Sequence, residues 1–138
     1  MKVLVETSVW SMALRKNQPH DVNILNELKE LIKELRVIVI GPVRQELLSG
    51  ISSEDKFKQL REHLGLFDDL PLNTEYFEFA AQLSNTCRKY GIQGSHTDFL
   101  ICSVAINNSF SIFTVDKDFN KYKKYIEIKL HAIRKELI

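Results

Sequence analysis

The chain has 138 residues, of which 44% are apolar and 27% are charged, and its formal net charge is +1 at pH 7. These values are typical of a globular protein with a substantial core, so we expect one domain over residues 1–138. They exclude the strong overall basic charge of many nucleic-acid-binding proteins. The charge is nonetheless uneven: residues 51–80 hold three Lys or Arg and seven Asp or Glu, whereas residues 81–138 hold nine and five.

Cysteines and apolar runs indicate the compartment. Cys87 and Cys102 are the only cysteines, and neither belongs to a Cys-x-x-Cys motif or a Cys/His cluster. We therefore expect buried free thiols, which suit a reducing compartment. The apolar stretch before Glu6 is too short for a signal peptide, and no run approaches the ~18 apolar residues that a membrane span needs. The sequence thus predicts a cytoplasmic protein without a membrane anchor.

Strand-like and helix-like patterns alternate in the first half of the chain. Apolar residues recur with a helical period from Ile24 to Leu35, and the β-branched run after Arg36 is typical of a buried strand. In chain order we expect a strand over Lys2–Val5, a helix capped by Thr7 or Ser8 and reaching about Leu14, a loop with Pro19, a helix over residues 23–35, a strand over Val37–Ile40, and a helix from Pro42 to near Gly50.

The second half continues this alternation. We expect a helix over residues 53–64, an edge strand or loop over Leu66–Leu72, a helix from Thr74 to Gly91, a helix over Phe99–Ile106, a strand over Ser111–Val115, a helix over Asp118–Tyr125, and a strand over Ile126–Leu130. The predicted inner face of the 74–91 helix comprises Phe77, Ala80, Ala81, Ser84 and Cys87. Strands that alternate with helices, without hairpin signals, predict an α/β fold with a mostly parallel sheet covered on both faces.

Four carboxylates stand where such a sheet would gather them. Glu6 and Asp116 each follow an apolar strand-like run, and Glu46 and Asp98 each lie near the start of a helical pattern. Because ligands bind at the carboxyl ends of parallel strands, these four side chains can converge there. Crowded carboxylates repel one another unless a cation holds them, and hard divalent ions such as Mg²⁺ prefer oxygen ligands. A metal site is therefore the leading interpretation.

Each acid also has an ordinary structural explanation. Ser95-x-x-Asp98 matches a helix capping box, and an isolated Glu such as Glu46 is usually solvated. The run Asp116-x-Asp118-x-Asn120 superficially matches a calcium-binding loop, but Lys121 replaces the required glycine. Glu6 is the stronger candidate, since an acid at the end of a buried strand needs a partner or access to solvent.

Taken together, these segments resemble the PIN-domain ribonucleases, and specifically the VapC toxins of toxin–antitoxin pairs. The resemblance rests on four stretches in the family's order: Val5-Glu6-Thr7-Ser8-Val9-Trp10, Gln45-Glu46-Leu47-Leu48-Ser49-Gly50, Thr97-Asp98-Phe99-Leu100-Ile101 and Thr114-Val115-Asp116-Lys117-Asp118-Phe119. It implies a PIN-like three-layer α/β/α sandwich with a mostly parallel central sheet.

The resemblance also implies the roles of individual residues. The catalytic acids would be Glu6, Glu46, Asp98 and Asp116, and the metal ligands would include Glu6, Asp98, Asp116 and the accessory Asp118. Thr7 and Thr114 would orient these carboxylates or a bound water. The family has Asp where this chain has Glu6, and the extra methylene moves the carboxylate by about 1.5 Å. Glu6 is therefore either a natural retuning or an introduced change that weakens a toxic nuclease.

The predicted function is a Mg²⁺- or Mn²⁺-dependent endoribonuclease that cleaves RNA. The candidate RNA-binding cations are Arg15, Lys16, Lys117, Lys121, Lys123 and Lys124. The resemblance further implies a homodimer and a VapB-like antitoxin, which the helices at 23–35 and 53–64 would receive. Two alternatives stay open: a PIN fold that binds RNA or an antitoxin without turnover because of Glu6, and a phosphoacceptor receiver domain, although the 37–40 strand is followed by Gly-Pro rather than by an acceptor Asp.

Overall fold

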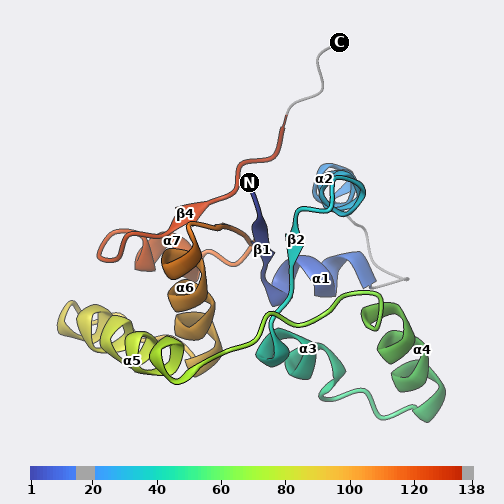
Figure 1. Cartoon of the computed structure of the whole chain (residues 1–138), viewed down its shortest axis with the longest axis horizontal. Coiled ribbons are helices and arrows are strands. Elements are labelled where there is room, and N and C mark those ends of the chain that lie inside the picture. Colours follow the sequence, from blue (N-terminus) through green and yellow to red (C-terminus); the bar gives the residue numbers. More distant parts are fainter. Residues whose placement is uncertain (15–20, 135–138) are drawn as a thin grey trace.

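The sheet in the centre of the molecule is entirely parallel. The computed structural model describes residues 1–14 and 21–134, and within them four strands pair in the order β2-β1-β3-β4 (Figure 1). The strands are β1 (Val3–Val5), β2 (Val37–Ile38), β3 (Ser111–Phe113) and β4 (Lys129–Leu130). β1 is buried along its whole length, as expected for a strand with neighbours on both edges and helices on both faces.

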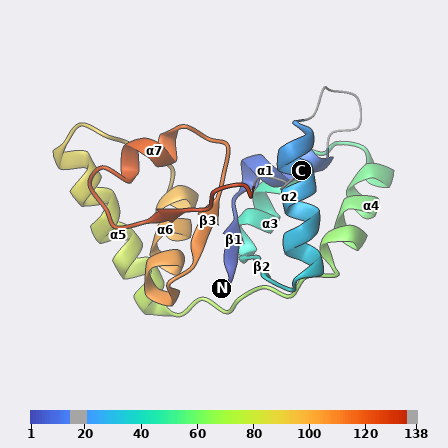
Figure 2. The same cartoon turned by 90° about the horizontal axis from the view of Figure 1, so that it is seen from above.

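Helices cover both faces of this sheet. Those described are α1 (Thr7–Leu14), α2 (Val22–Lys33), α3 (Gly41–Leu48), α4 (Glu54–Leu64), α5 (Thr74–Lys89), α6 (His96–Asn108) and α7 (Asp118–Tyr122). Helices α1 to α4 lie on one side of the strands, and α5 and α6 lie on the other (Figure 2). The predicted three-layer α/β/α sandwich with a parallel sheet is therefore confirmed. No helix of the described residues is long and apolar enough to cross a membrane.

Helix α6 lies between the sheet and α5. All of its residues from Phe99 to Ala105 are buried, because β3 contacts one side of the helix and α5 contacts the other. The nearly uninterrupted apolar sequence of this helix predicted such burial. Cys87 and Cys102 are both fully buried and free, as expected from their apolar surroundings. Burial raises the pKa of both thiols, so neither has the thiolate character of a reactive cysteine.

The inner face of α5 differs from the predicted one. The helix begins at Thr74 as predicted, and Asn73 caps it by accepting from the backbone N–H of Tyr76. The buried residues are Ala80, Leu83 and Cys87, whereas Phe77 is 52% exposed. The helix is rotated relative to the prediction, since Leu83 is buried and Tyr76 and Phe79 pack against the core in place of Phe77 and Ala81.

The four strands of the sheet are all shorter than predicted. β3 ends at Phe113 because the Thr114 side chain turns to bind Glu6, and the last strand is confined to Lys129–Leu130. The segment predicted as an edge strand or loop makes one isolated parallel bridge, between Val39 and Asp69.

Arg44 of α3 holds this segment in place. Its guanidinium donates to the carboxylate of Asp69 at 3.0 Å and to the carbonyl oxygens of Leu64 and Phe67 at 2.7 and 2.5 Å. These three acceptors, all within residues 64–69, bind one planar guanidinium group. The segment is therefore held in place although it does not form a full strand. The loop is thereby fastened beside the sheet.

Buried polar contacts fasten the segment after β4 to α2. Glu27 is 4% exposed and accepts hydrogen bonds from Arg134 at 3.0 Å, and one of its carboxylate oxygens lies 2.7 Å from Nε2 of His131. Arg134 also reaches Glu34 at the end of α2, at 2.7 Å. The C-terminal part of the described chain therefore crosses from the edge of the sheet to the opposite helical layer (Figure 1).

Candidate metal centre

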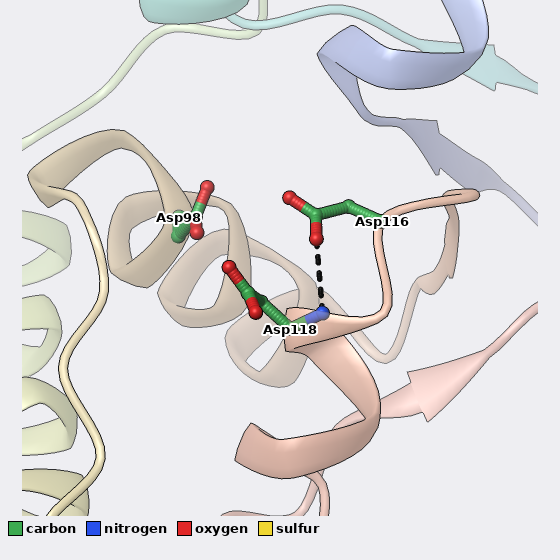
Figure 3. Close-up of side chains that lie close together, drawn as sticks. All are labelled: Asp98, Asp116 and Asp118. Carbon is green, nitrogen blue, oxygen red and sulfur yellow. Dashed lines mark hydrogen bonds between the residues drawn. The ribbon is translucent and has the colours of Figure 1, made fainter.

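Three aspartates meet at the carboxyl edge of the sheet. Asp98 lies in the first turn of α6, Asp116 lies in the connection from β3 to α7, and Asp118 is the first residue of α7. Each offers one carboxylate oxygen, and these three oxygens lie within 4.8 Å of one another. In Figure 3 the carboxylates of Asp98, Asp116 and Asp118 point towards a common space between α6 and the connecting loop.

The loop that carries Asp116 and Asp118 is ordered by its own hydrogen bonds. The backbone N–H of Asp116 donates to the Thr114 hydroxyl at 2.9 Å, and the N–H of Asp118 donates to the Asp116 carboxylate, also at 2.9 Å (Figure 3). Asp commonly accepts from the N–H two residues later, and this turn brings its carboxylate back along the chain. The turn therefore places two acids on the same side of a short connection.

Asp98 is held by a tyrosine from the neighbouring helix. The hydroxyl of Tyr122 donates to Oδ2 of Asp98 at 2.6 Å, and Tyr122 itself is fully buried. Burial raises the pKa of Asp98; the bonds to Tyr122 and Ser95 oppose this shift, while the nearby Asp116 and Glu46 carboxylates add to it. Burial and the adjacent acids also raise the pKa of Tyr122, so its hydroxyl remains a donor at neutral pH.

The ring of Tyr122 fits only because residue 94 is glycine. A Cβ at Gly94 would lie 2.2 Å from the Tyr122 hydroxyl oxygen and 3.0 Å from the ring of Phe99. Backbone and ring are thus in closer contact than any side chain at residue 94 would allow. Gly94 therefore supports the position of Asp98 through Tyr122.

Glu6 lies outside the group that the three aspartates form. Its carboxylate is 5% exposed and accepts hydrogen bonds from the hydroxyls of Ser8 and Thr114, the latter at 2.5 Å. Burial raises the pKa of Glu6; the two hydroxyls oppose the shift, and the negative charge of Asp98 adds to it. Among the described residues, the group close enough to share one ion comprises Asp98, Asp116 and Asp118, without Glu6 or Glu46.

Glu46 lines a surface depression together with Thr7 and Thr97. Its exposed carboxylate accepts a 2.6 Å hydrogen bond from the hydroxyl of Thr7. Both residues line a surface depression of about 470 Å³ together with Pro42, Gln45, Ser49 and Thr97. Thr7 therefore orients Glu46, and Thr114 orients Glu6, so the two predicted supporting threonines act on different acids.

The three aspartates fit a small divalent cation. Two oxygen ligands on opposite sides of an octahedral Mg²⁺ lie about 4.2 Å apart, since each Mg–O distance is about 2.0–2.1 Å. A spacing within 4.8 Å therefore needs only small side-chain movements. An all-oxygen, anionic donor set suits Mg²⁺ or Mn²⁺ and disfavours Zn²⁺ or copper, which prefer nitrogen and sulfur ligands.

The predicted RNA-binding cations are only partly described. Arg15 and Lys16 lie outside the described residues. Lys117 is exposed directly before Asp118, and Lys121 lies 3.5 Å from the Asp118 carboxylate. Lys123 and Lys124 are exposed just after α7. The basic side chains therefore lie next to the acidic group, where they can partly offset its charge.

Sequence reasoning missed Ser8, Gly94 and Tyr122 in this site. Ser8 was expected only as a helix cap, whereas its hydroxyl binds Glu6 and accepts from the N–H of Val115 at 3.1 Å. Tyr122 falls in the predicted 118–125 helix, in which only lysines were expected to have a role beside Asp118. The one sequence signal for its burial is the pair Phe119 and Tyr122, which lie on one face of an otherwise polar helix.

A parallel sheet between two helical layers, with acids gathered at its carboxyl edge, defines the class of α/β proteins with an acidic centre suited to a metal ion. Within that class the chain belongs to the PIN domain family, because the family's model matches residues 3–125. The expected resemblance is thereby confirmed for family and fold. The receiver-domain alternative is excluded by the same match. No curated protein matches the chain.

Solved structures support the fold. The chain is similar to FitAcB from Neisseria gonorrhoeae (23% identity, TM-score 0.74, covering 94% of this chain and 96% of that one). It is also similar to VapBC2 from Rickettsia felis bound to a promoter DNA fragment (20% identity, TM-score 0.75, covering 95% of this chain and 98% of that one). The chain is similar as well to a toxin–antitoxin complex from Klebsiella pneumoniae (14% identity, TM-score 0.64, covering 86% of this chain and 90% of that one). At these identities the likeness concerns the fold.

Proposed function

We propose that the chain is a Mg²⁺- or Mn²⁺-dependent endoribonuclease toxin of the VapC type, acting in the cytoplasm as one PIN domain over residues 1–138. The observation that carries the proposal is the convergence of Asp98, Asp116 and Asp118 within 4.8 Å at the carboxyl edge of a PIN fold. The motif resemblance supports RNA as the substrate. The solved relatives include a toxin–antitoxin complex, which supports the toxin role.

In this proposal the three aspartates hold the divalent ion, which would activate a water molecule and stabilise charge on the phosphodiester. Tyr122 keeps Asp98 in one rotamer through its 2.6 Å hydrogen bond. The Thr114 hydroxyl donates to Glu6 and accepts from the N–H of Asp116, so it couples the ends of β1 and β3. Glu46 lines the surface depression with Thr7 and Thr97, where the RNA backbone would enter.

Cleavage of a fluorescent single-stranded RNA, with Mn²⁺ and with EDTA, tests the proposal. Asp98→Asn should abolish both cleavage and the rise in melting temperature that Mn²⁺ causes in the wild type. Asp55→Asn, a matched change in the first turn of α4, should leave both unchanged. Equal cleavage by EDTA-treated and Mn²⁺-loaded protein would contradict the proposal.

Glu6 favours a second candidate function, a PIN fold that binds RNA or antitoxin without turnover. Its carboxylate is already bound by two hydroxyls and lies outside the acidic group of Asp98, Asp116 and Asp118. A centre with one acid withdrawn would hold its ion less firmly. If neither the wild type nor Glu6→Asp cleaves RNA with Mg²⁺ or Mn²⁺, this second candidate is the better one.

We further propose a VapB-like antitoxin and a homodimer as partners. Helices α2 and α4 lie on the same flank (Figure 2), and a depression of about 380 Å³ along α4 is lined by Ile51, Ser52, Glu54, Phe57, Lys58 and Arg61. Apolar side chains between charged ones suit a partner's amphipathic segment. Co-purification with a co-expressed antitoxin tests the first partner, and sedimentation at high micromolar concentration tests the dimer.

A further inference from the structure

Two exposed tyrosines are stacked on the surface. The rings of Tyr90 and Tyr125 lie 4.2 Å apart between centroids and are inclined by 11°. Tyr90 is 60% exposed and Tyr125 is 39% exposed. Most large aromatic rings of a folded protein lie in its core, so a parallel pair that leaves much of its area in water presents an aromatic surface.

Both tyrosines are held firmly by the backbone. Tyr90 ends α5, where its N–H donates to the carbonyl of Cys87 at 3.0 Å, and Gly91 then turns the chain with a φ of +77°. Tyr125 follows α7, where its N–H donates to the carbonyl of Tyr122 at 2.9 Å. The end of α5 and the segment after α7 lie side by side (Figure 2). The stacked pair therefore sits on fixed backbone.

The pair also lies near the acidic centre. Tyr125 is joined to Tyr122 by a turn, and residues joined by such a turn have Cα atoms less than about 7 Å apart. The hydroxyl of Tyr122 in turn reaches Asp98 at 2.6 Å. One short segment, Asp118 to Tyr125, therefore begins at the three aspartates and ends at the stacked rings.

The charge around the pair is positive. Arg88 and Lys89 precede Tyr90, and Lys123 and Lys124 precede Tyr125; all four are exposed and make no ion pair within the described residues. The acidic residue that follows Tyr125 is Glu127, two positions later in the sequence. The other end of α5 differs, because its exposed aromatic residue, Phe77, is followed by Glu78.

We propose that Tyr90 and Tyr125 form a base-stacking platform for single-stranded RNA beside the acidic centre. A nucleobase continues the stack on the exposed ring face, and the neighbouring Lys and Arg side chains bind the phosphates. This combination of aromatic rings and cations is how proteins hold single strands without reading their sequence. The proposal rests on the proposed function, whose substrate it defines as unpaired RNA with accessible bases.

Binding without cleavage tests the platform. Wild-type protein in EDTA is titrated into a fluorescein-labelled 12-nucleotide RNA and into an abasic strand of equal length, with fluorescence anisotropy as the readout. Tyr90→Leu, which keeps an apolar side chain without a ring, should weaken binding to the RNA about fivefold or more. Tyr90→Phe should bind as the wild type does, and all three proteins should bind the abasic strand equally. Phe77→Leu is the matched control and should bind the RNA normally.

A second variant tests the cations. Lys123→Ala with Lys124→Ala should reduce the slope of log affinity against log salt concentration by about 0.7 for each phosphate that these lysines neutralise in the wild type. Equal RNA affinity of wild type and Tyr90→Leu would overturn the platform, even if Asp98→Asn abolishes cleavage. The platform would also be overturned if Tyr90→Leu lost the same affinity for the RNA and for the abasic strand. The same holds if Tyr90→Leu weakened binding to a co-expressed protein partner and not to the RNA. Conversely, ring-dependent binding without any cleavage would support the platform while contradicting the nuclease.

Discussion

The hydroxyl of Tyr122 and the carboxylate of Asp98 are joined by a 2.6 Å hydrogen bond between α7 and α6. Tyr122 thereby links the two halves of the acidic centre, since its own helix begins at Asp118. The position of one aspartate thus depends on the same short helix that carries another. Removing the hydroxyl while keeping the ring isolates this link.

We expect Tyr122→Phe to weaken Mn²⁺ binding about tenfold, because residues that hydrogen-bond to a metal ligand typically contribute 10–100-fold to affinity. Isothermal titration calorimetry measures the change. Tyr76→Phe is a matched control, since the Tyr76 hydroxyl accepts from Asn108 at 2.9 Å outside the acidic centre. Unchanged Mn²⁺ affinity in Tyr122→Phe would mean that packing alone positions Asp98.

Gly94→Ala should destabilise the protein by about 1–3 kcal/mol, the usual cost of forcing an extra carbon into a filled space. The new Cβ would overlap the Tyr122 hydroxyl, so the ring must move and Asp98 loses its donor. Urea denaturation measures the free energy of unfolding. Gly41→Ala serves as the control, because its nearest neighbour would be Asp69 Oδ2 at an ordinary 3.7 Å. Equal stability of the two variants would contradict the close contact.

The metal-free protein should become less stable as the pH rises above about 4.5. The pKa values of Glu6 and Asp98 are raised mainly by burial, so the folded state holds their protons more tightly than the unfolded chain does. Stability then falls between the unfolded pKa and the folded pKa. Thermal unfolding in EDTA across this range measures the slope. Glu6→Gln with Asp98→Asn should flatten it, and an unchanged slope would assign the pH dependence to other groups.

Glu6→Asp should raise RNA cleavage about tenfold or more if Glu6 is a displaced ligand. The change removes one methylene from a side chain outside the group of three aspartates and keeps the carboxylate, so the fold should persist. Initial cleavage rates with Mn²⁺ measure the effect, and circular dichroism checks the fold. Unchanged cleavage by both proteins would identify Glu6 as a tolerated natural residue.

Glu27→Gln should cost about 1–3 kcal/mol of stability at pH 7, because a buried carboxylate loses charged hydrogen bonds to Arg134. Burial alone would raise the pKa of Glu27, but Arg134 and His131 lower it overall. The stabilisation is therefore complete above the unfolded pKa and disappears as the pH falls through the folded pKa. Glu34→Gln, the exposed partner of the same arginine, should cost less. A wild-type advantage that persists at pH 2 would contradict the charge-based account.

The sequence predicted the parts of the fold that depend on local patterns. The alternation of apolar runs and helical periods located the strands and helices, and the acids that follow β1 and β3 were expected at the carboxyl edge. The face that α5 turns inward was predicted only in part: Ala80 and Cys87 are buried as expected, whereas Leu83 is buried and Phe77 is exposed. Which stripe is buried depends on the partner helix, and no local pattern of α5 contains that information.

In the candidate site, too, the sequence predicted the residues that depend on local patterns and not those that depend on distant contacts. Asp98, Asp116 and Asp118 were identified from their places relative to strands and helices. Tyr122 was not, because its contact with Asp98 joins residues 24 positions apart and depends on the absence of a side chain at Gly94. Ser8 was expected only in a local role at a helix terminus, whereas its hydroxyl acts over a separation of more than 100 residues.

The pairing of β1 with β3 has a consequence for synthesis of the protein. Val3 pairs with Ser111 and Val5 with Phe113, so the central pair of the sheet joins the first strand to a segment made more than 100 residues later. A growing chain folds from its N-terminal part, yet Glu6 then has neither Thr114 nor the three aspartates beside it. The acidic centre is therefore absent from every shorter nascent chain. Under the proposed function, the chain would be inactive as a nuclease while most of it is being translated, and its ribosome would meet that activity only after β3 has joined β1.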